Sequence, residues 1–203
     1  MYLAKTPLAL KKTYPNLIWD LPNDNNTVYL TFDDGPTPDI TDWVLDILAE
    51  YQAKATFFVV GENAKKHPEI IRRILKEGHA IGNHTQHHLN GWKTKTAEYI
   101  KDVEECQQYL DTELFRPPYG KIKRAQIKRL KDQYKIVMWD VLSGDFDLDI
   151  NPEKCYTNVI DKVKSGSIIV FHDSLKAAEN LKYTLPKVLE ELIKNGVVFD
   201  VLR

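Results

Sequence analysis

The chain has 203 residues, a length that suits one α/β domain with a substantial hydrophobic core. Its composition, 43% hydrophobic and 28% charged, is that of an ordinary globular protein. The net charge of −1 excludes a general basic field of the kind that attracts nucleic acid or anionic lipid, so neither is expected as a partner.

The N-terminal 26 residues include several basic side chains, but Lys5, Pro7 and the Lys11–Lys12 pair interrupt their apolar stretch. No signal-peptide core of about 7–15 apolar residues is present there, and no membrane span is predicted anywhere in the chain. This pattern indicates a soluble cytoplasmic protein, and a leader removed beforehand would leave the same pattern. We expect residues 1–26 to be a strap packed on a single domain formed by residues 27–203.

Strand-like and helix-like segments alternate along that domain. Apolar or β-branched runs predict strands at 27–32, 55–60, 79–82, 114–116, 134–139, 167–171 and 197–202. Amphipathic patterns with proline starts and glycine stops predict helices at 38–51, 68–76, 94–110, 125–131, 152–164 and 181–194. This alternation predicts a parallel α/β sheet with right-handed crossovers, which either closes as a barrel or remains an open, doubly wound sheet.

The two cysteines, Cys106 and Cys155, lie in predicted helices. They form neither a CxxC pair nor a disulfide framework, so we expect both to be buried or half-buried thiols.

Five short motifs follow or end the predicted strands. They are TFDDGP (31–36), NHTQHH (83–88), RPPYG (116–120), WDVLSGDF (139–146) and IIVFHD (168–173). In a parallel α/β protein, residues that follow successive strands converge at one end of the sheet or barrel, where active sites form. The shared position favours an enzyme over a scaffold.

Asp33 and Asp34 end the first predicted strand and lead into Gly35 and Pro36. Neighbouring residues of an extended chain point to opposite sides, so two adjacent carboxylates rarely share one role. Where the chain turns through Gly-Pro, one carboxylate is able to meet a metal ion while the other faces a substrate. The alternative is a turn without catalytic function, because Asp-Gly-Pro sequences are common between elements.

His84, His87 and His88 lie just past the third predicted strand. Histidines three or four residues apart share one face of a helical turn and are close enough to bind a single ion. Two imidazoles and one carboxylate form a known catalytic zinc set that leaves one position open for water. Three histidines within five residues favour a metal site, but the spacing leaves open whether His87 or His88 accompanies His84.

Arg116 ends the short fourth strand and is followed by two prolines, Tyr119 and Gly120. Its guanidinium would pair with a carboxylate and hold it ionised. A stiff loop of this kind would also present backbone N–H groups to a developing oxyanion. The alternative is a proline-rich connection with an arginine at the surface.

His172 ends the apolar strand at 168–171 and is either a buried, hydrogen-bonded histidine or a proton donor. Asp145 would orient it and raise its pKa. Asp173 is expected to be an N-cap or turn residue for the next segment of the chain, and Asp140 fits either a turn or a polar network.

In this order the five motifs resemble those of the polysaccharide deacetylases of carbohydrate esterase family 4, over about residues 27–202. The resemblance implies a distorted (β/α) barrel of about seven parallel strands, with residues 27–203 as the catalytic domain. It also implies one divalent metal ion, usually Zn²⁺, and removal of acetyl groups from N-acetylated sugars of chitin, peptidoglycan or exopolysaccharide. Some members of the family act on O-acetylated xylan.

Residue by residue, the resemblance makes Asp33 the general base and Asp34, His84 and His88 the metal ligands. His87 is then only their neighbour.

The remaining catalytic roles also follow from the resemblance. Arg116 matches the arginine that pairs with the base, and the backbone N–H of Tyr119 matches an oxyanion donor. His172 matches the general acid, and Asp145 matches the carboxylate that tunes it. Water would attack with the help of the Asp base, and the His acid would protonate the leaving amine.

Substrate-binding residues are expected at Phe146, Val170 and Pro118. Phe146 stands where the family usually has Trp, and Val170 where it usually has Leu. Both positions line the pocket for the acetyl group or sugar in the family, so these departures change the expected shape of the groove and leave the catalytic set intact.

Two other functions compete with a polysaccharide deacetylase. One is a metal amidohydrolase of the same fold that acts on a small amide, and the other is a non-catalytic carbohydrate-binding module. The absence of a long insertion predicts an open groove, which favours a polymer or oligosaccharide. The complete set of ligands, base and acid favours catalysis over binding alone.

Overall fold

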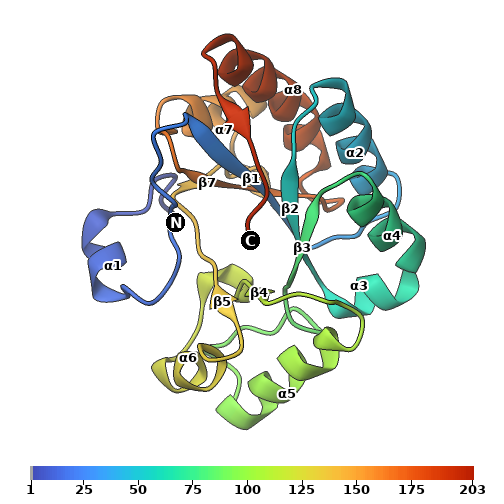
Figure 1. Ribbon diagram of the computed structural model, residues 1–203, viewed down its shortest axis with the longest axis vertical. Helices are drawn as coiled ribbons and strands as arrows, with labels where there is room; N and C mark the ends of the chain where they lie inside the picture. The colour runs from blue at the N-terminus through green and yellow to red at the C-terminus, as the bar shows by residue number, and fades with distance from the viewer. Residues whose placement is uncertain (1) are drawn as a thin grey trace.

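A computed structural model describes residues 2–203, in which parallel strands form a curled inner layer with helices around it (Figure 1). The strands are β1 (Thr27–Asp33), β2 (Ala55–Val59), β3 (Ala80–Asn83), β4 (Leu114–Phe115), β5 (Lys135–Ile136), β6 (Val141–Leu142), β7 (Ile168–His172) and β8 (Val198–Phe199). The helices are α1 (Leu8–Thr13), α2 (Ile40–Glu50), α3 (Gly61–Lys66), α4 (Pro68–Lys76), α5 (Thr96–Gln107), α6 (Arg124–Leu130), α7 (Pro152–Ile160) and α8 (Ala178–Lys194), with a short 3₁₀ turn, η1 (Pro118–Gly120).

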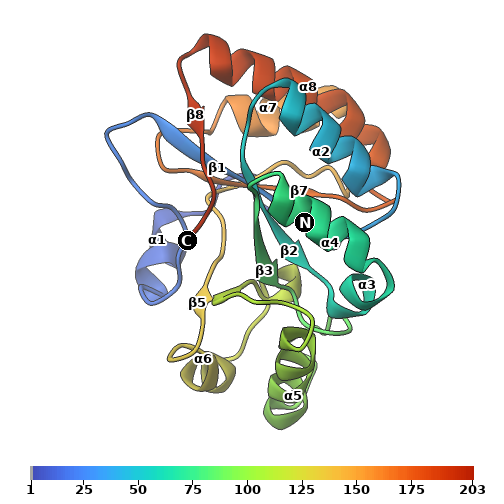
Figure 2. The same cartoon turned by 45° about the vertical axis from the view of Figure 1, so that its right-hand side comes forward.

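The strands are ordered β5-β4-β3-β2-β1-β7-β6, and β8 pairs beside the start of β1. Neighbouring strands along this path are parallel. The sheet curls so that its two ends approach residues 2–26, which we call the N-terminal segment (Figure 2). The structure therefore confirms a single α/β domain whose seven-stranded path forms a distorted, incomplete (β/α) barrel.

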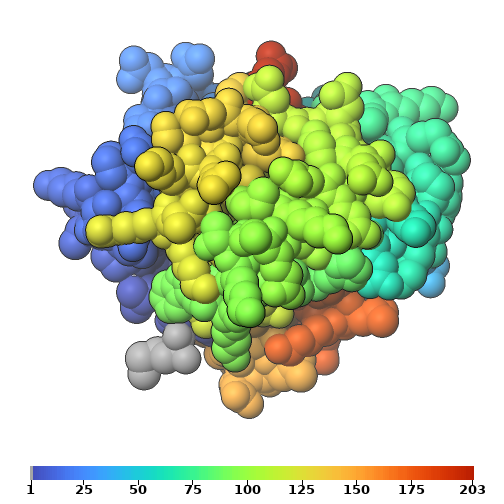
Figure 3. Space-filling model, turned by 90° about the horizontal axis from the view of Figure 1, so that it is seen from below, coloured from blue at the N-terminus to red at the C-terminus, as the bar shows by residue number. Residues whose placement is uncertain are grey.

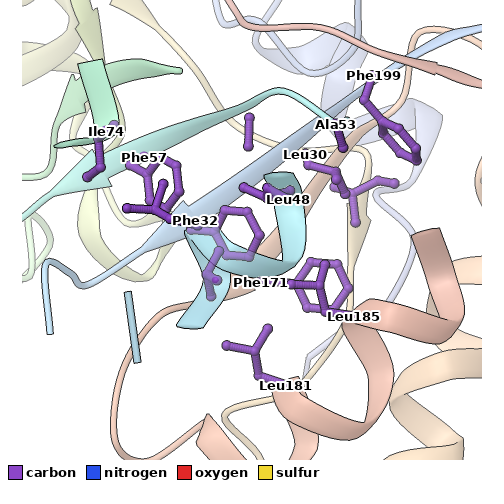
Figure 4. Close-up of a cluster of buried hydrophobic side chains, with 14 of the residues drawn as sticks. Leu30, Phe32, Leu48, Ala53, Phe57, Ile74, Phe171, Leu181, Leu185 and Phe199 are labelled. Atoms are coloured by element: carbon purple, nitrogen blue, oxygen red, sulfur yellow. The ribbon is translucent and has the colours of Figure 1, made fainter. Parts of the chain in front are cut away.

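The strands are continuous apolar runs in the sequence because both faces of the sheet are covered. All five residues of β2 are buried. On the outer face, Phe32 stacks between Phe57 and Phe171, with ring centroids 5.1 and 6.0 Å away, and the stripe of α8 that includes Leu181 and Leu185 covers this layer (Figure 4). This packing fixes the strand register on which the positions of the motif residues depend.

The N-terminal segment lies in the gap between the two ends of the barrel. Within residues 2–203, β5 and β6 do not pair with each other. Ile18 instead forms a parallel bridge with Val137, and Asp20 forms an antiparallel bridge with Ser167. Figure 3 shows this segment, in blue, beside the region of α6, in yellow, where Arg124 lies over the Tyr14 ring.

Asp140 anchors that segment to the domain. Its side chain is fully buried and accepts hydrogen bonds from Lys5 and Lys11, each at 2.5 Å, and from Ser167 at 2.6 Å. Lys11 also pairs with Asp20. Of the two alternatives for Asp140, the structure shows the polar network.

The strand predicted at 134–139 is wrong in its extent. It ends as β5 at Ile136, and a separate strand, β6, pairs with β7. Beyond Ile136 the chain pairs with the N-terminal segment, because Ile18 donates its N–H to Ile136 O and accepts the N–H of Met138. The short helices α1 and α3 were also not predicted, since neither has an apolar stripe long enough to recognise.

Both cysteines are buried and unpaired, as predicted. Among residues 2–203, no helix has the length and apolar character needed to cross a membrane.

Candidate active site

The carboxyl ends of the strands bring the five motifs to one edge of the sheet. In the register of β1, Asp33 lies opposite both Phe58 of β2 and His172 of β7. Asn83, which begins the histidine motif, lies opposite Val59 and Phe115. Residues that are far apart in the chain thus meet in one site.

Asp33 is paired with a buried arginine. Its Oδ1 accepts a hydrogen bond of 2.7 Å from Arg116 Nη1. Arg116 has no exposed surface, donates also to Thr31 Oγ1 and the Met138 carbonyl, and places its guanidinium 4.0 Å from the centre of the Phe58 ring. Burial lowers the pKa of Arg116 and the charge of Asp33 opposes this, so the arginine stays a fixed positive charge beside the carboxylate.

Asp34 turns away from Asp33 and towards two histidines. Its backbone has a φ of 83°, in the left-handed region, which lets the adjacent carboxylates face different partners. Asp34 Oδ1 lies 3.1 Å from His88 Nε2 and 3.8 Å from His84 Nε2. One ligand atom from each of these three residues lies within 4.8 Å of the others.

The protonation of these groups suits a cation. His84 Nδ1 lies 2.7 Å from the Arg116 carbonyl, so this nitrogen carries the proton and Nε2 keeps a free lone pair. Burial lowers the pKa of His84 to about 4. Burial alone would raise the pKa of Asp34, but the hydrogen bond from His88 and the charge of His172 outweigh it and hold that pKa well below its ordinary value.

His87 is the histidine that the spacing could not place, and it points elsewhere. Its Nδ1 lies 2.6 Å from Asp102 Oδ1, and its N–H donates to Asp102 Oδ2 at 3.1 Å. Asp102 is buried on α5, and its carbonyl also accepts the N–H of Gln86. The cluster therefore contains His88, whereas His87 anchors the loop between His84 and His88.

That loop contains two residues, Thr85 and His88, with positive φ values of 65° and 54°. Side chains hold both ends of it: Asn83 Oδ1 accepts the N–H of Thr85, and Thr85 Oγ1 accepts the N–H of Leu89. Asn83 and Asp102 were not among the predicted site residues. A signal for Asp102 was present, because it occupies an apolar-stripe position of α5 together with the buried Tyr99, Val103 and Cys106.

His172 and Asp145 form a second pair. Asp145 is fully buried. Its Oδ2 accepts the backbone N–H of His172 at 2.7 Å, and its Oδ1 lies 2.8 Å from His172 Nδ1. Asn180 of α8 holds the Asp145 carbonyl. Burial alone would lower the pKa of His172, but the charge and hydrogen bond of Asp145 outweigh it and raise the pKa to about 9. This shift favours the imidazolium form of His172, whose Nε2 then carries a proton.

Tyr119 lies at the turn of the RPPYG loop. It has a φ of 59°, and its ring centroid is 4.6 Å from that of His88. Its backbone N–H has no hydrogen-bond acceptor among residues 2–203, which leaves it free for a ligand. Pro118 is buried beneath this turn and holds it in place.

The expected substrate-binding residues differ in exposure. Phe146 is half-buried, and its ring lies edge-on to His172 at 5.0 Å and 5.2 Å from the ring of Tyr2. Val170 is only 1% exposed and lies within β7 between Ile169 and Phe171. Phe146 therefore has surface to offer a substrate next to the acid, whereas Val170 is covered.

Asp173 is not an N-cap, because Ala177 takes that position before α8, so this part of the prediction is wrong. Its side chain accepts the N–H of Gly35 at 3.0 Å and the hydroxyl of Thr41 at 2.6 Å. Burial raises its pKa to about 8. A Cβ at Gly35 would lie 2.0 Å from Asp173 Oδ2, so this contact requires glycine next to Asp34.

The donor set fits a metal ion. Two imidazole nitrogens and one carboxylate oxygen on one side of an ion are a known catalytic zinc set with an open position. The contact of His84 with a backbone carbonyl is the kind of support that metal-binding histidines usually have.

The family now follows from comparison with known proteins. A sequence model described as polysaccharide deacetylase matches residues 20–135. The chain belongs to this family. A peptidoglycan-N-acetylglucosamine deacetylase of Bacillus cereus is 36% identical over 189 residues, which cover 89% of this chain and 88% of that protein. The resemblance drawn from the five motifs is thereby confirmed.

Two further relatives extend the comparison. A chitooligosaccharide deacetylase of Azorhizobium caulinodans is 36% identical over 159 residues, 74% of this chain and 75% of that protein. A crystal structure of the Bc1960 peptidoglycan N-acetylglucosamine deacetylase, in complex with 4-naphthalen-1-yl-N-oxidanyl-benzamide, is also similar to this chain. The two superpose with a TM-score of 0.89 over 97% of this chain and 95% of the Bc1960 chain, and their sequences are 34% identical.

Proposed function

We propose that this protein is a metal-dependent hydrolase that removes the acetyl group from N-acetylated sugars of a polysaccharide or oligosaccharide. The observation that carries the proposal is the cluster of Asp34, His84 and His88, which lies near a buried Asp33–Arg116 pair and a His172–Asp145 pair. One cluster fits a metal, and the two pairs fit a base and an acid.

Asp34, His84 and His88 would hold one divalent ion, for which Zn²⁺ suits the donor set best. When bound, such an ion supplies polarisation of the acetyl carbonyl and of the attacking water. The N-hydroxyamide named with the Bc1960 structure belongs to a class of oxygen chelators, which supports a metal in this family.

Asp33 takes the proton of the attacking water. Arg116 fixes the orientation of its carboxylate through one Oδ1 contact and leaves the other oxygen as the acceptor. The Arg116 carbonyl also orients His84, so a single residue positions both the base and a proposed ligand.

The free N–H of Tyr119 stabilises the oxyanion that develops on the acetyl group. His172 then donates its Nε2 proton to the leaving nitrogen of the sugar, and Asp145 holds the resulting imidazole in place. Acetate leaves, and no covalent intermediate with the protein is required.

The names of the relatives support a substrate built from N-acetylhexosamines. One acts on peptidoglycan and another on chitooligosaccharides, so we propose a glycan chain of this kind as the substrate.

An acetate-release assay tests the proposal. Peptidoglycan, chitin oligomers, acetyl-xylan and small amides would be offered to the protein before chelation, after chelation, and after Zn²⁺ is restored. We expect release from the N-acetylated glycans, loss on chelation and recovery with metal. Release from small amides alone, or equal release after chelation, would contradict it.

A further inference from the structure

The turn that carries Asp34 depends on contacts from outside it. Asp34 has a φ of 83°, in the left-handed region that residues other than glycine seldom adopt. Such a conformation costs free energy and persists only where the surrounding structure enforces it. The direction of the Asp34 carboxylate therefore follows from the groups that fix its backbone.

One peptide group, formed by the carbonyl of Asp34 and the N–H of Gly35, is bound at both ends. Asn63 in α3 donates from Nδ2 to the Asp34 carbonyl at 2.9 Å. Asp173, directly after β7, accepts the Gly35 N–H on its Oδ1 at 3.0 Å. Because its oxygen and its N–H are both held, this planar group is not free to rotate, and the ψ of Asp34 is fixed.

The peptide group before Asp34 is held by the backbone of Asp173. The Asp33 carbonyl accepts the backbone N–H of Asp173 at 3.1 Å. The carboxylate of Asp173 is buried, and its Oδ2 accepts the hydroxyl of Thr41 at 2.6 Å, which anchors it to α2. Since both peptide planes beside Asp34 are held, its φ and ψ are set, and with them the direction in which its side chain leaves the backbone.

That direction leads to the two histidines. Asp34 Oδ1 lies 3.1 Å from His88 Nε2 and 3.8 Å from His84 Nε2. If the peptide group turned and Asp34 relaxed to a negative φ, its carboxylate would move away from these nitrogens. Binding of an ion would then require the turn to be ordered first, at an entropic cost that a ligand already in position avoids.

We propose that Asn63 and Asp173 are positioning residues for Asp34, which hold its carboxylate in place for a divalent cation. Neither supplies an atom to the cluster of Asp34, His84 and His88. They belong to different parts of the fold, α3 and the segment after β7, so substitution removes one contact at a time. This inference rests on the proposed function, in which Asp34 is a metal ligand.

The test is the affinity of the metal-free protein for Co²⁺, measured by titration and followed by the visible spectrum of the bound ion. Asn63→Ala and Asp173→Ala each remove one contact to the peptide group. We expect the affinity to fall by about 10–100-fold in each variant, the usual effect of removing support behind a ligand. Asp173→Asn keeps an oxygen for the Gly35 N–H, so it should bind Co²⁺ far more tightly than Asp173→Ala.

Asn26→Ala is the matched control. Asn26 also has a left-handed φ, 52°, and its Nδ2 donates to the Asn195 carbonyl at 3.2 Å, but it precedes β1 at the end opposite Asp34. Its loss should lower the melting temperature of the metal-free protein and leave the Co²⁺ affinity unchanged. An affinity that falls equally in Asn26→Ala, or that stays unchanged in Asn63→Ala, would overturn the inference. Asn63 is half-buried, so this variant decides the matter if Asp173→Ala does not fold.

Acetate release separates this inference from the proposed function. A Co²⁺ affinity that falls in Asn63→Ala and Asp173→Ala supports the inference even if no glycan loses acetate, an outcome that overturns only the deacetylase proposal. Metal-dependent acetate release with unchanged affinities in both variants overturns the inference alone. If the unmodified protein binds no Co²⁺, the inference fails together with the metal-dependent part of the proposed function.

Discussion

Asp33 and Asp34 are neighbours in the chain, yet they contact entirely different partners. Asp33 continues the strand and meets Arg116, whereas the positive φ of Asp34 sends its carboxylate to His84 and His88. A difference of one residue therefore separates the proposed base from the proposed ligand.

Substitution should separate the two roles. Asp33→Asn should retain the metal and lose about 10²–10⁴ in kcat, the usual range for a general base. Asp34→Asn should lose metal affinity, because an amide oxygen is a weaker ligand for Zn²⁺ than a carboxylate. Metal content by atomic absorption, together with kcat, checks both variants. Near-normal turnover in Asp33→Asn would show that another group is the base.

The pH dependence of kcat should report the His172–Asp145 pair. The raised pKa of about 9 keeps His172 protonated at lower pH, so activity should persist through neutrality and fall as the pH rises through about 9. In Asp145→Asn the stabilising charge is lost, and the alkaline fall should move to lower pH by about 1–3 pH units. The profile of kcat against pH checks this. An alkaline limb at the same pH in both proteins would exclude His172 as its origin.

Phe146 should influence which substrate is preferred. It is half-buried against His172 and Tyr2, so a larger indole there would reshape the groove. We expect Phe146→Trp to change the relative kcat/KM of two glycans by about 1–3 kcal/mol with metal content unchanged. A lowered melting temperature with an unchanged substrate ranking would instead indicate overpacking of a core residue.

At the scale of elements, helix α5 holds the loop that carries the proposed histidine ligands. Asp102 bonds both the N–H and Nδ1 of His87 and so fixes the residue next to His88. The geometry repeats that of Asp145 with His172, where one carboxylate likewise binds the N–H and Nδ1 of a single histidine. The Asp102 carboxylate differs in that it positions a loop, which contains two residues with left-handed backbone conformation, Thr85 and His88.

Loss of this contact should weaken metal binding without removing a ligand. Asp102→Ala should reduce the affinity for Co²⁺ by about 10–100-fold, the usual effect of removing support behind a ligand. Glu104→Ala, which removes an exposed acid from the same helix, is the matched control. Titration with Co²⁺, followed by its visible spectrum, measures both affinities. Equal affinities in the two variants would confine Asp102 to a purely structural role.

At the scale of the whole molecule, an incomplete barrel is completed by the chain's own N-terminal segment. Lys5 lies 135 residues from Asp140 in the sequence and Lys11 lies 129 residues from it, yet both ammonium groups bond to the buried carboxylate of Asp140. Removing one partner of a buried ion pair is costly because the other charges lose their compensation.

Asp140→Asn should therefore lower the free energy of unfolding by up to about 3–5 kcal/mol. Asp132→Asn changes a surface carboxylate that is 77% exposed, and it should stay within about 0.5 kcal/mol of the original protein. Urea unfolding at neutral pH measures both. Equal stability of the two variants would mean that the segment is held by its backbone bridges and apolar contacts instead.

Local sequence patterns were sufficient to predict the class of fold and to bring five motifs to one edge of the sheet. Alternating strand and helix patterns imply a parallel sheet, and the carboxyl ends of parallel strands share one edge. Asp33, His84, Arg116, Asp145 and His172 were therefore expected together from the sequence alone. Local periodicity carries this information because it reports which face of each element is buried.

Which side chains touch depends instead on how the elements pack in three dimensions. The choice between His87 and His88 depends on Asp102 and on left-handed residues that spacing does not reveal. The pairing of Ile136 and Met138 depends on Ile18, and the role of Asp173 depends on Gly35 and Thr41. Each of these contacts joins residues distant in sequence, and such partners are selected by tertiary packing, a property that no local pattern records.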